Sequence, residues 1–237
     1  MIITTKAIVL NTIKYADYDM IVKCYTELGV KSYLVKRIFK QKTGKLSPAF
    51  FQPLTQLEIT ANYNSAKTLH FINEATISHS YSTIPLEVTK QAIAVFLSEI
   101  LSKVLREEEV NQHLFAYIET AFIWLDTHTM SANFHLLFLM NLTKYLGFYP
   151  ESKEGSLYFD LENGKFVNQP LSKHYLSGKN LTHFKRLLGT HFDVLHELKF
   201  TKKERQFLLE NIIQYFELHL PGFHKPTSLE VLKAVFS

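Results

Sequence analysis

Six basic side chains lie close together near the start of the chain, with two aromatic side chains among them. The basic residues are Lys31, Lys36, Arg37, Lys40, Lys42 and Lys45, and the aromatic residues are Tyr33 and Phe39. No aspartate or glutamate interrupts residues 28–57. Lysine and arginine neutralise phosphates, and aromatic rings offer faces on which unpaired bases stack. The expected chemistry is therefore binding of a single-stranded nucleic acid through its phosphates and bases.

The same residues also have a purely structural explanation. Lysines are common on the exposed edge of a β-sheet, where their charge prevents pairing with another sheet. The charge distribution favours binding, because residues 1–80 hold ten Lys/Arg against five Asp/Glu, whereas residues 81–237 hold 16 against 17. The excess positive charge therefore lies in the first third of the chain, which indicates a module there that binds a polyanion.

The composition predicts a globular protein of one or two domains that resides in a reducing cytoplasm. A chain of 237 residues that is 46% hydrophobic can bury a substantial core. The single cysteine, Cys24, excludes an internal disulfide and any site built from several thiolates. The start of the chain lacks the pattern of a signal peptide, and the longest apolar runs are about six residues, so we expect no membrane partner.

Residues 1–80 are expected to form a five-stranded barrel. Runs of β-branched and aromatic residues of strand length alternate with turn signals, and the expected strands lie within residues 2–10, 20–25, 33–39, 54–60 and 68–77. Five strands is the count of the OB-fold, whose sheet face and loops bind single strands. A small SH3-like barrel fits the same count nearly as well.

Residues 81–237 are expected to form a mainly α-helical domain, because the hydrophobic period changes to that of helices after Tyr81. One helix is expected between a candidate N-cap at Ser131 and a terminating Gly147. Capping-box spacings predict helix starts at two threonines, in the pairs Thr201 with Glu204 and Thr227 with Glu230.

A β-hairpin is expected at about residues 156–168, between two of these helices. The Asn163-Gly164 pair favours a tight type I′ turn, because both residues tolerate positive φ. The predicted fold class is therefore α+β, with an OB-fold barrel over residues 1–80 and a helical domain with a hairpin insertion over residues 81–237.

The order of these elements, together with several short motifs, resembles the RecO family of DNA repair proteins. The motifs are Ala7-Ile-Val-Leu10, Tyr15-Ala-Asp-Tyr-Asp19, Tyr25-Thr-Glu-Leu-Gly29, Val35-Lys-Arg37, Gln52-Pro-Leu54 and Tyr145-Leu-Gly-Phe-Tyr-Pro150. The last of them is similar to the family's Leu-Gly-Phe-x-Pro helix end. The likeness covers almost the whole chain and implies an OB-fold followed by a helical domain.

The resemblance implies a recombination mediator without catalytic activity. Such a protein binds single- and double-stranded DNA, anneals complementary strands and, with RecR, helps load RecA recombinase on strands coated by single-strand-binding protein. The resemblance leaves open whether RecF is a further partner. We expect a monomer that is cytoplasmic and associated with the nucleoid. The alternative is an interaction adaptor whose basic barrel binds RNA or an acidic protein.

The resemblance also implies a site in the helical domain for the C-terminal tail of the single-strand-binding protein. A groove between helices with basic side chains at its rim would accept an acidic peptide with an apolar end. The cations available for this role are Lys144, Lys179, Lys185 and Arg186.

Metal and catalytic sites are not expected. Many members of the family carry a four-cysteine zinc site after the Gly-Phe-x-Pro element, but that region of this chain holds no cysteine. The predicted hairpin occupies the corresponding place, so we predict no structural zinc and no other cofactor. A nuclease that binds a metal through Asp17 and Asp19 is an alternative, but turn chemistry explains these residues more simply. We predict no catalytic residue, because the chain has no phosphate loop, nucleophile elbow or His-Glu-x-x-His motif.

Overall fold

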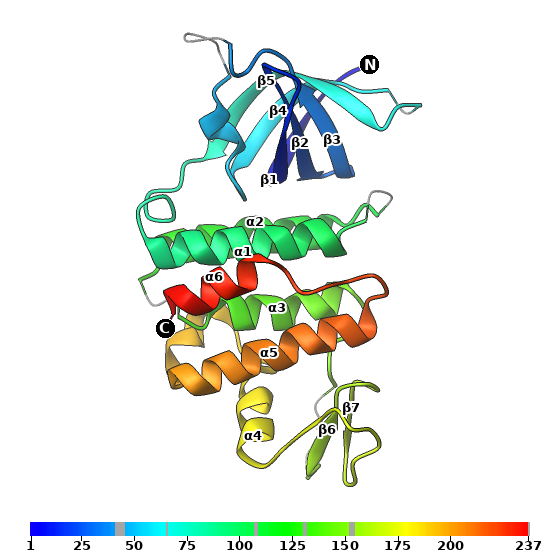
Figure 1. Ribbon diagram of the computed structural model, residues 1–237, viewed down its shortest axis with the longest axis vertical. Helices are drawn as coiled ribbons and strands as arrows, with labels where there is room; N and C mark the ends of the chain where they lie inside the picture. Colours follow the sequence, from blue (N-terminus) through cyan, green and yellow to red (C-terminus); the bar gives the residue numbers. More distant parts are fainter. Residues whose placement is uncertain (41–45, 65, 107–108, 130–131, 152–154, 237) are drawn as a thin grey trace. The chain divides into compact units, whose positions relative to one another are not determined.

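The computed structural model describes residues 1–40, 46–64, 66–106, 109–129, 132–151 and 155–236. The chain forms two compact units, Met1–Thr127 and His128–Ser237. The first unit consists of a β-barrel and two helices, and the second consists of the remaining helices and a small sheet (Figure 1). Each unit has its own hydrophobic core, and we describe the two separately.

Five strands form a closed barrel in the first unit. They are β1 (Ile2–Tyr15), β2 (Asp19–Thr26), β3 (Gly29–Val35), β4 (Gln56–Asn62) and β5 (Leu69–His79), and a short 3-10 helix, η1 (Pro48–Phe51), lies between β3 and β4. The strand order is β1-β2-β3-β5-β4, with β3 parallel to β5 and the other neighbours antiparallel. This arrangement confirms the predicted five-stranded OB-fold.

The barrel interior is filled by alternate residues of the strands, as the two-residue period of a strand requires. Val22 of β2 lies opposite Tyr33 of β3, and both side chains are fully buried in this core. The interpretation of Tyr33 as a stacking residue is therefore wrong, because its ring faces other core residues and offers no surface to a base. Cys24 is also fully buried, and burial raises the pKa of its thiol to about 12.

Two helices pack with the barrel in the first unit, α1 (Val88–Val104) and α2 (Gln112–Thr127). The Lys6 ammonium lies 2.9 Å from a Glu119 carboxylate oxygen, and the Gln56 amide donates a hydrogen bond to the Glu119 carbonyl oxygen. The chain thus changes from strand to helix near residue 80, while its contacts keep the first two helices in the same compact unit as the barrel.

A buried carboxylate anchors the segment that leads from the barrel to α1. The backbone N–H groups of Ser82, Thr83 and Ile84 donate to the Asp126 carboxylate at 2.8–2.9 Å. Burial disfavours the charged form, but these hydrogen bonds outweigh it and lower the pKa of Asp126 to about 2. The buried Lys90 ammonium also donates to the Asp126 carbonyl oxygen, so a charged network fixes the start of the helical part.

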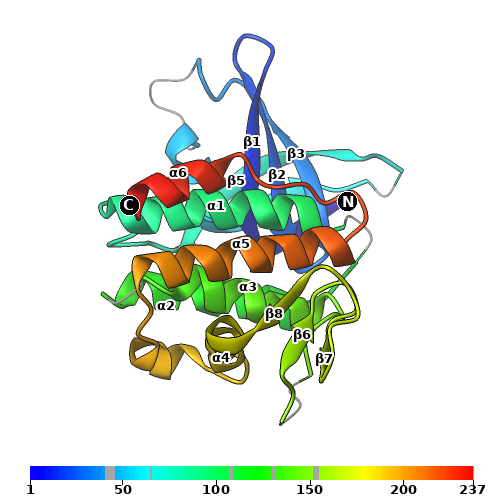
Figure 2. The same ribbon diagram turned by 60° about the horizontal axis from the view of Figure 1, so that its bottom comes forward.

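The helices of the second unit are α3 (Phe134–Tyr145), α4 (Gly178–Leu187), the 3-10 helix η2 (Phe192–Glu197), α5 (Lys202–His219) and α6 (Ser228–Val235). Figure 2 shows α3 and α5 side by side. The predicted end of α3 is confirmed, because Gly147 has a φ of 83° and the Phe148 N–H donates to the Thr143 carbonyl oxygen at 3.1 Å. Its predicted N-cap Ser131 lies outside the described residues, and Asn133 precedes the first helical residue.

The two predicted capping boxes have different outcomes. The Thr201 hydroxyl accepts the Glu204 N–H at 3.3 Å, and the Glu204 carboxylate accepts the Thr201 N–H at 2.9 Å, so the first box is confirmed. Thr227 precedes α6, but its backbone is already helical and its side chain makes no capping hydrogen bond. The side-chain oxygen can cap only when the N-cap residue has an extended backbone, so spacing alone is not sufficient.

A three-stranded sheet replaces the predicted simple hairpin. The strands β6 (Tyr158–Asp160) and β7 (Lys165–Val167) pair as predicted, and β8 (Tyr175–Ser177) adds a third strand that the sequence did not reveal. The predicted type I′ turn is wrong: Asp160 pairs with Lys165 across a four-residue loop in which Gly164 has a φ of 64°. Asn163 instead donates its N–H to the Asp160 carboxylate at 2.8 Å.

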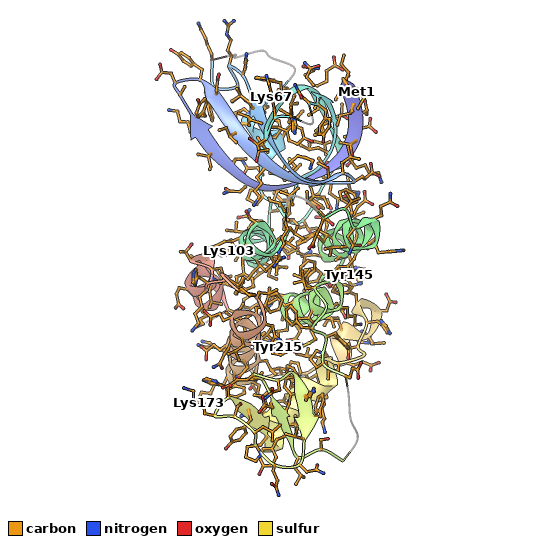
Figure 3. All side chains as sticks on the ribbon, turned by 90° about the vertical axis from the view of Figure 1, so that its right-hand side faces the viewer. Met1, Lys67, Lys103, Tyr145, Lys173 and Tyr215 are labelled. Carbon is orange, nitrogen blue, oxygen red and sulfur yellow. The ribbon has the colours of Figure 1, made fainter. Side chains whose placement is uncertain are left out.

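Aromatic packing holds this small sheet against α4 and α5. The ring of Phe159 lies 4.7 Å from that of Phe184 and 5.6 Å from that of Tyr215, measured between ring centres. Tyr215, labelled in Figure 3, donates its hydroxyl to the Phe148 carbonyl oxygen at 2.6 Å. Buried rings and hydrogen bonds therefore hold this region in place.

Among the described residues, no helix is long and apolar enough to span a membrane.

Candidate nucleic-acid interface

The basic segment that follows β3 is a turn and not a strand. β3 ends at Val35, whereas the sequence favoured a strand up to Phe39, and Arg37 has a φ of 55° that a strand cannot accommodate. The backbone N–H of Arg37 donates to the Asp19 carboxylate at 2.8 Å. The explanation of these cations as a protected sheet edge therefore does not apply to Lys36, Arg37 and Lys40, which lie beyond the strand.

The tip of the β1–β2 hairpin lies beside this turn. The Phe39 N–H donates to the Tyr18 carbonyl oxygen at 3.1 Å, and the Lys40 ammonium lies 5.5 Å from the centre of the Tyr18 ring. These contacts join two segments that are about twenty residues apart in the sequence. Because the hairpin and the turn hold one another in position, the side chains between them form a preorganised surface.

Three aromatic side chains are exposed on this surface. Their exposed fractions are 51% for Tyr15, 47% for Tyr18 and 43% for Phe39. Exposed rings next to cations are the combination that binds single strands without regard to sequence, because every base has a π face and every nucleotide has a phosphate. We name the surface formed by Tyr15, Tyr18, Lys36, Arg37, Phe39 and Lys40 the tip surface.

The predicted DNA-binding residues are therefore divided by the structure. Lys36, Arg37, Phe39 and Lys40 meet at the tip surface, whereas Tyr33 lies in the core. Lys31 is half-buried on β3, and burial, together with the charge of Lys31, lowers the pKa of His70. Lys42 and Lys45 lie outside the described residues.

The sequence interpretation did not identify Tyr15 and Tyr18 as stacking residues and quoted them within a motif of the family resemblance. Both residues stand at a hairpin tip, where an apolar ring has no core to enter. Two tyrosines three residues apart, at the end of β1 and in the turn that follows it, were the signal that could have identified them. Asp17 and Asp19 flank Tyr18, and Asp19 binds the Arg37 N–H, so this carboxylate serves the turn. Within the described residues, no group of three His, Cys, Asp or Glu side chains could hold a metal ion.

The four cations that were expected to bind a peptide do not converge on one groove. Lys179 pairs with Glu204 at 2.5 Å, and the Lys185 ammonium donates to the Ser156 carbonyl oxygen at 3.0 Å. The Lys144 ammonium lies over the Tyr149 ring at 4.6 Å, and the Arg186 guanidinium donates to the Glu197 carbonyl oxygen at 3.3 Å. Each is thus engaged with a different neighbour.

A different groove in the second unit combines apolar and basic side chains. It lies among α3, α5 and α6, and its lining includes Lys202, Arg205, Leu209, Leu232, Lys233 and Phe236. Leu209 and Leu232 are buried at its base, and the Arg205 guanidinium lies 5.7 Å from the centre of the Phe236 ring. We name this feature the α5–α6 groove.

Comparisons with known families account for both units. The N-terminal domain of recombination protein O matches residues 1–81, and its C-terminal domain matches residues 86–228. The chain belongs to the RecO family. DNA repair and recombination are therefore the processes to which it is assigned, and the two matched domains meet near the point where strands give way to helices.

Full-length relatives support the assignment to the RecO family. The DNA repair protein RecO of Flavobacterium psychrophilum is 44% identical and that of Christiangramia forsetii is 42% identical, each over the whole of both chains. The RecO protein of Bacteroides fragilis is 36% identical over the same full extent. The match to the solved structure of an aspartyl-tRNA synthetase from Entamoeba histolytica extends over 98% of this chain and 55% of the synthetase chain, at 10% sequence identity. Its TM-score of 0.24 is too low to support an argument.

Proposed function

We propose that the chain is a recombination mediator that binds single- and double-stranded DNA, anneals complementary strands and, with RecR, helps load RecA on strands coated by single-strand-binding protein. Family membership and the tip surface support this proposal. The observation that carries it is the meeting of Lys36, Arg37 and Lys40 with the exposed rings of Tyr18 and Phe39 at one end of an OB-fold barrel.

DNA binding at the tip surface follows from two kinds of contact. The cations take phosphates and release their condensed counterions, while the rings of Tyr18 and Phe39 stack on bases. Neither contact reads the sequence of bases, which suits a protein that must act wherever a strand is damaged. We assign this role to the barrel, residues 1–80, and propose that the chain acts by binding and not by catalysis.

Annealing would follow from neutralisation of charge. Two complementary strands repel one another through their phosphates, and cations that cover the phosphates lower this repulsion. Stacking on exposed rings leaves the hydrogen-bonding edges of the bases free to pair. The tip surface therefore favours the encounter of two strands without forming or breaking a covalent bond.

The α5–α6 groove is our proposed site for the acidic C-terminal tail of the single-strand-binding protein. Lys202 and Arg205 would bind carboxylates of the tail, while Leu209, Leu232 and Phe236 would cover its apolar end. This proposal replaces the cations first considered, Lys144, Lys179, Lys185 and Arg186. RecR is a proposed partner and RecF an optional one, and we propose a monomer in the cytoplasm that associates with the nucleoid.

The test of this function is annealing of complementary oligonucleotides that carry a donor and an acceptor fluorophore. We expect the chain to accelerate the rise in energy transfer, both with bare strands and with strands coated by single-strand-binding protein. Deletion of the acidic tail from the coating protein should abolish the acceleration on coated strands and leave that on bare strands intact. A chain that binds single strands but does not accelerate annealing of bare strands would refute the annealing role.

RNA provides a second arm of the same experiment. Phosphates and base faces are common to DNA and RNA, so the tip surface by itself does not distinguish the two. An RNA strand of the same sequence should therefore bind with similar affinity. Much tighter binding of RNA than DNA would favour the alternative function, an RNA-binding adaptor.

A further inference from the structure

A hollow on the barrel wall adjoins the tip surface. It has a volume of about 580 Å³, and it lies where β3 pairs with β5 and where β4 ends. Phe71 of β5 forms one wall, and the Lys36 ammonium lies 4.8 Å from the centre of its ring. Leu34 and Ile72 also line the hollow, and their side chains are mostly buried. The hollow therefore combines an aromatic ring and a cation with an apolar surface.

Two side-chain amides border the same hollow. Asn62 donates a hydrogen bond from its Nδ2 to the Asn73 Oδ1 at 3.1 Å. A carboxamide has two donor hydrogens and two acceptor lone pairs, so this single bond leaves the pair with both donors and acceptors for a ligand. The polar edge of the hollow therefore suits a ligand that carries donors and acceptors side by side.

Asn73, which lies beside Asn62, stands at a bulge in β5. Ala61 pairs with Ile72 and Thr60 pairs with Glu74, so Asn73 is an extra residue without a partner on β4. A bulge turns side chains out of the regular alternation, and bulges often lie next to functional sites. Asn73 lies on the same face of β5 as Phe71, two residues earlier, and next to Asn62, which is the cross-strand partner of Phe71.

We infer that this hollow binds one unpaired base of the single strand held at the tip surface. The base would stack on Phe71, its edge would bond to Asn62 and Asn73, and its phosphate would bind Lys36. This inference rests on the proposed function and extends it from a surface that covers any strand to a pocket that requires an unpaired base.

The chemistry of the hollow favours a base over an apolar side chain of a protein partner. An apolar side chain would use Phe71 but would bury the remaining donors and acceptors of the two amides without partners, which costs free energy. A base satisfies both, because it combines a flat π face with donors and acceptors along one edge. The ammonium of Lys36 matches the phosphate that accompanies every base.

One strand can reach both the hollow and the tip surface. Lys36 borders the hollow, and Phe39 belongs to the tip surface three residues further on, a separation of at most roughly 11 Å along the chain. The segment between them therefore connects the two sites. A duplex has no unpaired base to insert, so the pocket contributes to the binding of single strands and not to that of double strands.

The experiment compares two fluorescent single strands of equal length, one with bases and one with abasic residues throughout. Phe71→Leu removes the ring but keeps an apolar side chain, and Asn73→Ala removes one amide. For the strand with bases we expect affinity to fall about tenfold for Phe71→Leu and about fivefold for Asn73→Ala. The affinities for the abasic strand and for duplex DNA should not change.

Two controls accompany these variants. Ile77→Ala changes an exposed residue of the same strand that does not line the hollow and should bind like the native chain. The salt dependence of binding should be unaltered in Phe71→Leu and Asn73→Ala, because neither substitution removes a phosphate contact. Circular dichroism and the thermal midpoint verify that each variant folds.

The outcomes distinguish failure of the pocket from failure of the proposed function. If both variants bind both strands like the native chain, the pocket is refuted, although the tip surface can still be the DNA site. If the two variants bind DNA normally but no longer bind RecR, the hollow holds a side chain of the protein partner and the inference is wrong. If the native chain binds neither strand nor duplex, the proposed function itself fails.

Discussion

The lysines of the barrel tip differ in their surroundings from two lysines of the second unit, Lys179 and Lys233, although other cations there, such as Lys144, also lie over rings. At the tip, Lys36 and Lys40 extend over aromatic rings. In the second unit, Lys179 lies 2.5 Å from a Glu204 carboxylate oxygen and Lys233 lies 2.9 Å from one of Glu210. Cations over rings remain available to phosphates, whereas cations paired with carboxylates must first give up their partners.

This difference shows why the charge of a segment is a poor guide to its role. The sequence marks Lys179 and Lys36 equally as cations, but Glu204 neutralises the first from a helix 25 residues away. The lysine hydrogen bond also lowers the pKa of Glu204 to about 2. The acid-free window of sequence was informative because the hairpin tip that the fold brings to it directs its Asp19 carboxylate to the backbone N–H of Arg37.

Charge reversal of the tip cations should have the largest effect on the affinity for single-stranded DNA. The triple variant Lys36→Glu, Arg37→Glu and Lys40→Glu should bind a single-stranded oligonucleotide at least about a hundredfold more weakly at low salt, because it removes three phosphate contacts and adds repulsion. Fluorescence anisotropy with a labelled strand of mixed sequence measures the effect.

The matched control changes the same net charge in the second unit. The exposed lysines Lys165, Lys173 and Lys203, changed together to Glu, should weaken binding only slightly, since long-range charge effects are screened by salt. Equal losses in the two triple variants would mean that overall charge, and not the tip surface, determines DNA binding.

Removal of single rings at the tip should have the next largest effect. Tyr18→Ala and Phe39→Ala should each weaken single-strand binding by about tenfold, because each stacked base contributes about 1–3 kcal/mol. Tyr18→Phe keeps the ring and should bind like the native chain. If Tyr18→Phe loses as much as Tyr18→Ala, then the hydroxyl matters and stacking is not the reason.

The two units should also differ in their response to acid. The Asp126 pKa is lowered to about 2, so the stabilisation it gives the first unit is complete above its ordinary pKa near 3.8 and is lost between about pH 4 and 2. In the second unit, burial and the Arg205 charge lower the pKa of His135 to about 3 from 6.5. The folded state there resists protonation, so its stability declines as the pH falls from about 6.5 to 3.

An acid titration can follow the units by different signals. Trp124 is the single tryptophan and belongs to the first unit, whereas the far-ultraviolet circular dichroism reports both units. We expect the helical circular dichroism signal to begin to fall at a higher pH than that at which the Trp124 fluorescence changes. The substitution His135→Leu should move this loss of helical signal to lower pH. Coincident transitions that His135→Leu does not shift would contradict this expectation.

The smallest expected effect is on peptide binding at the α5–α6 groove. Lys202→Glu should weaken binding of an acidic peptide with an apolar end by about fivefold, because it replaces an attractive charge by a repulsive one at the groove. Lys203→Glu is the matched control, since Lys203 is the next residue and does not line the groove. Isothermal titration calorimetry measures both variants, and equal losses would place the peptide elsewhere.

Most of the fold follows from local patterns. The five barrel strands, the end of α3 at Gly147 and the capping box at Thr201 all depend on residues within a few positions of one another. The end of β3 was missed because it depends on Asp19, which holds the Arg37 N–H from another strand. The strand β8 was missed because three residues are too few to show a period.

The site was harder to predict than the fold. The sequence identified the cations of the tip surface, but it could not tell that Tyr33 faces the core and Phe39 faces solvent, since this depends on where β3 ends. The α5–α6 groove combines residues from three helices that are far apart in the chain, so no local motif marks it. The pocket at Phe71 combines residues of β3, β4 and β5, which only the register of these strands brings together.

The salt dependence of single-strand binding tests the central claim most directly. Neutralisation of the tip surface, by Lys36→Gln with Arg37→Gln and Lys40→Gln, removes three phosphate contacts without adding repulsion. The slope of log affinity against log salt should then become shallower by about 2 relative to the native chain, since each contact on a single strand contributes about 0.7. An unchanged slope in a folded variant would show that these cations do not contact the phosphates and that the strand binds elsewhere.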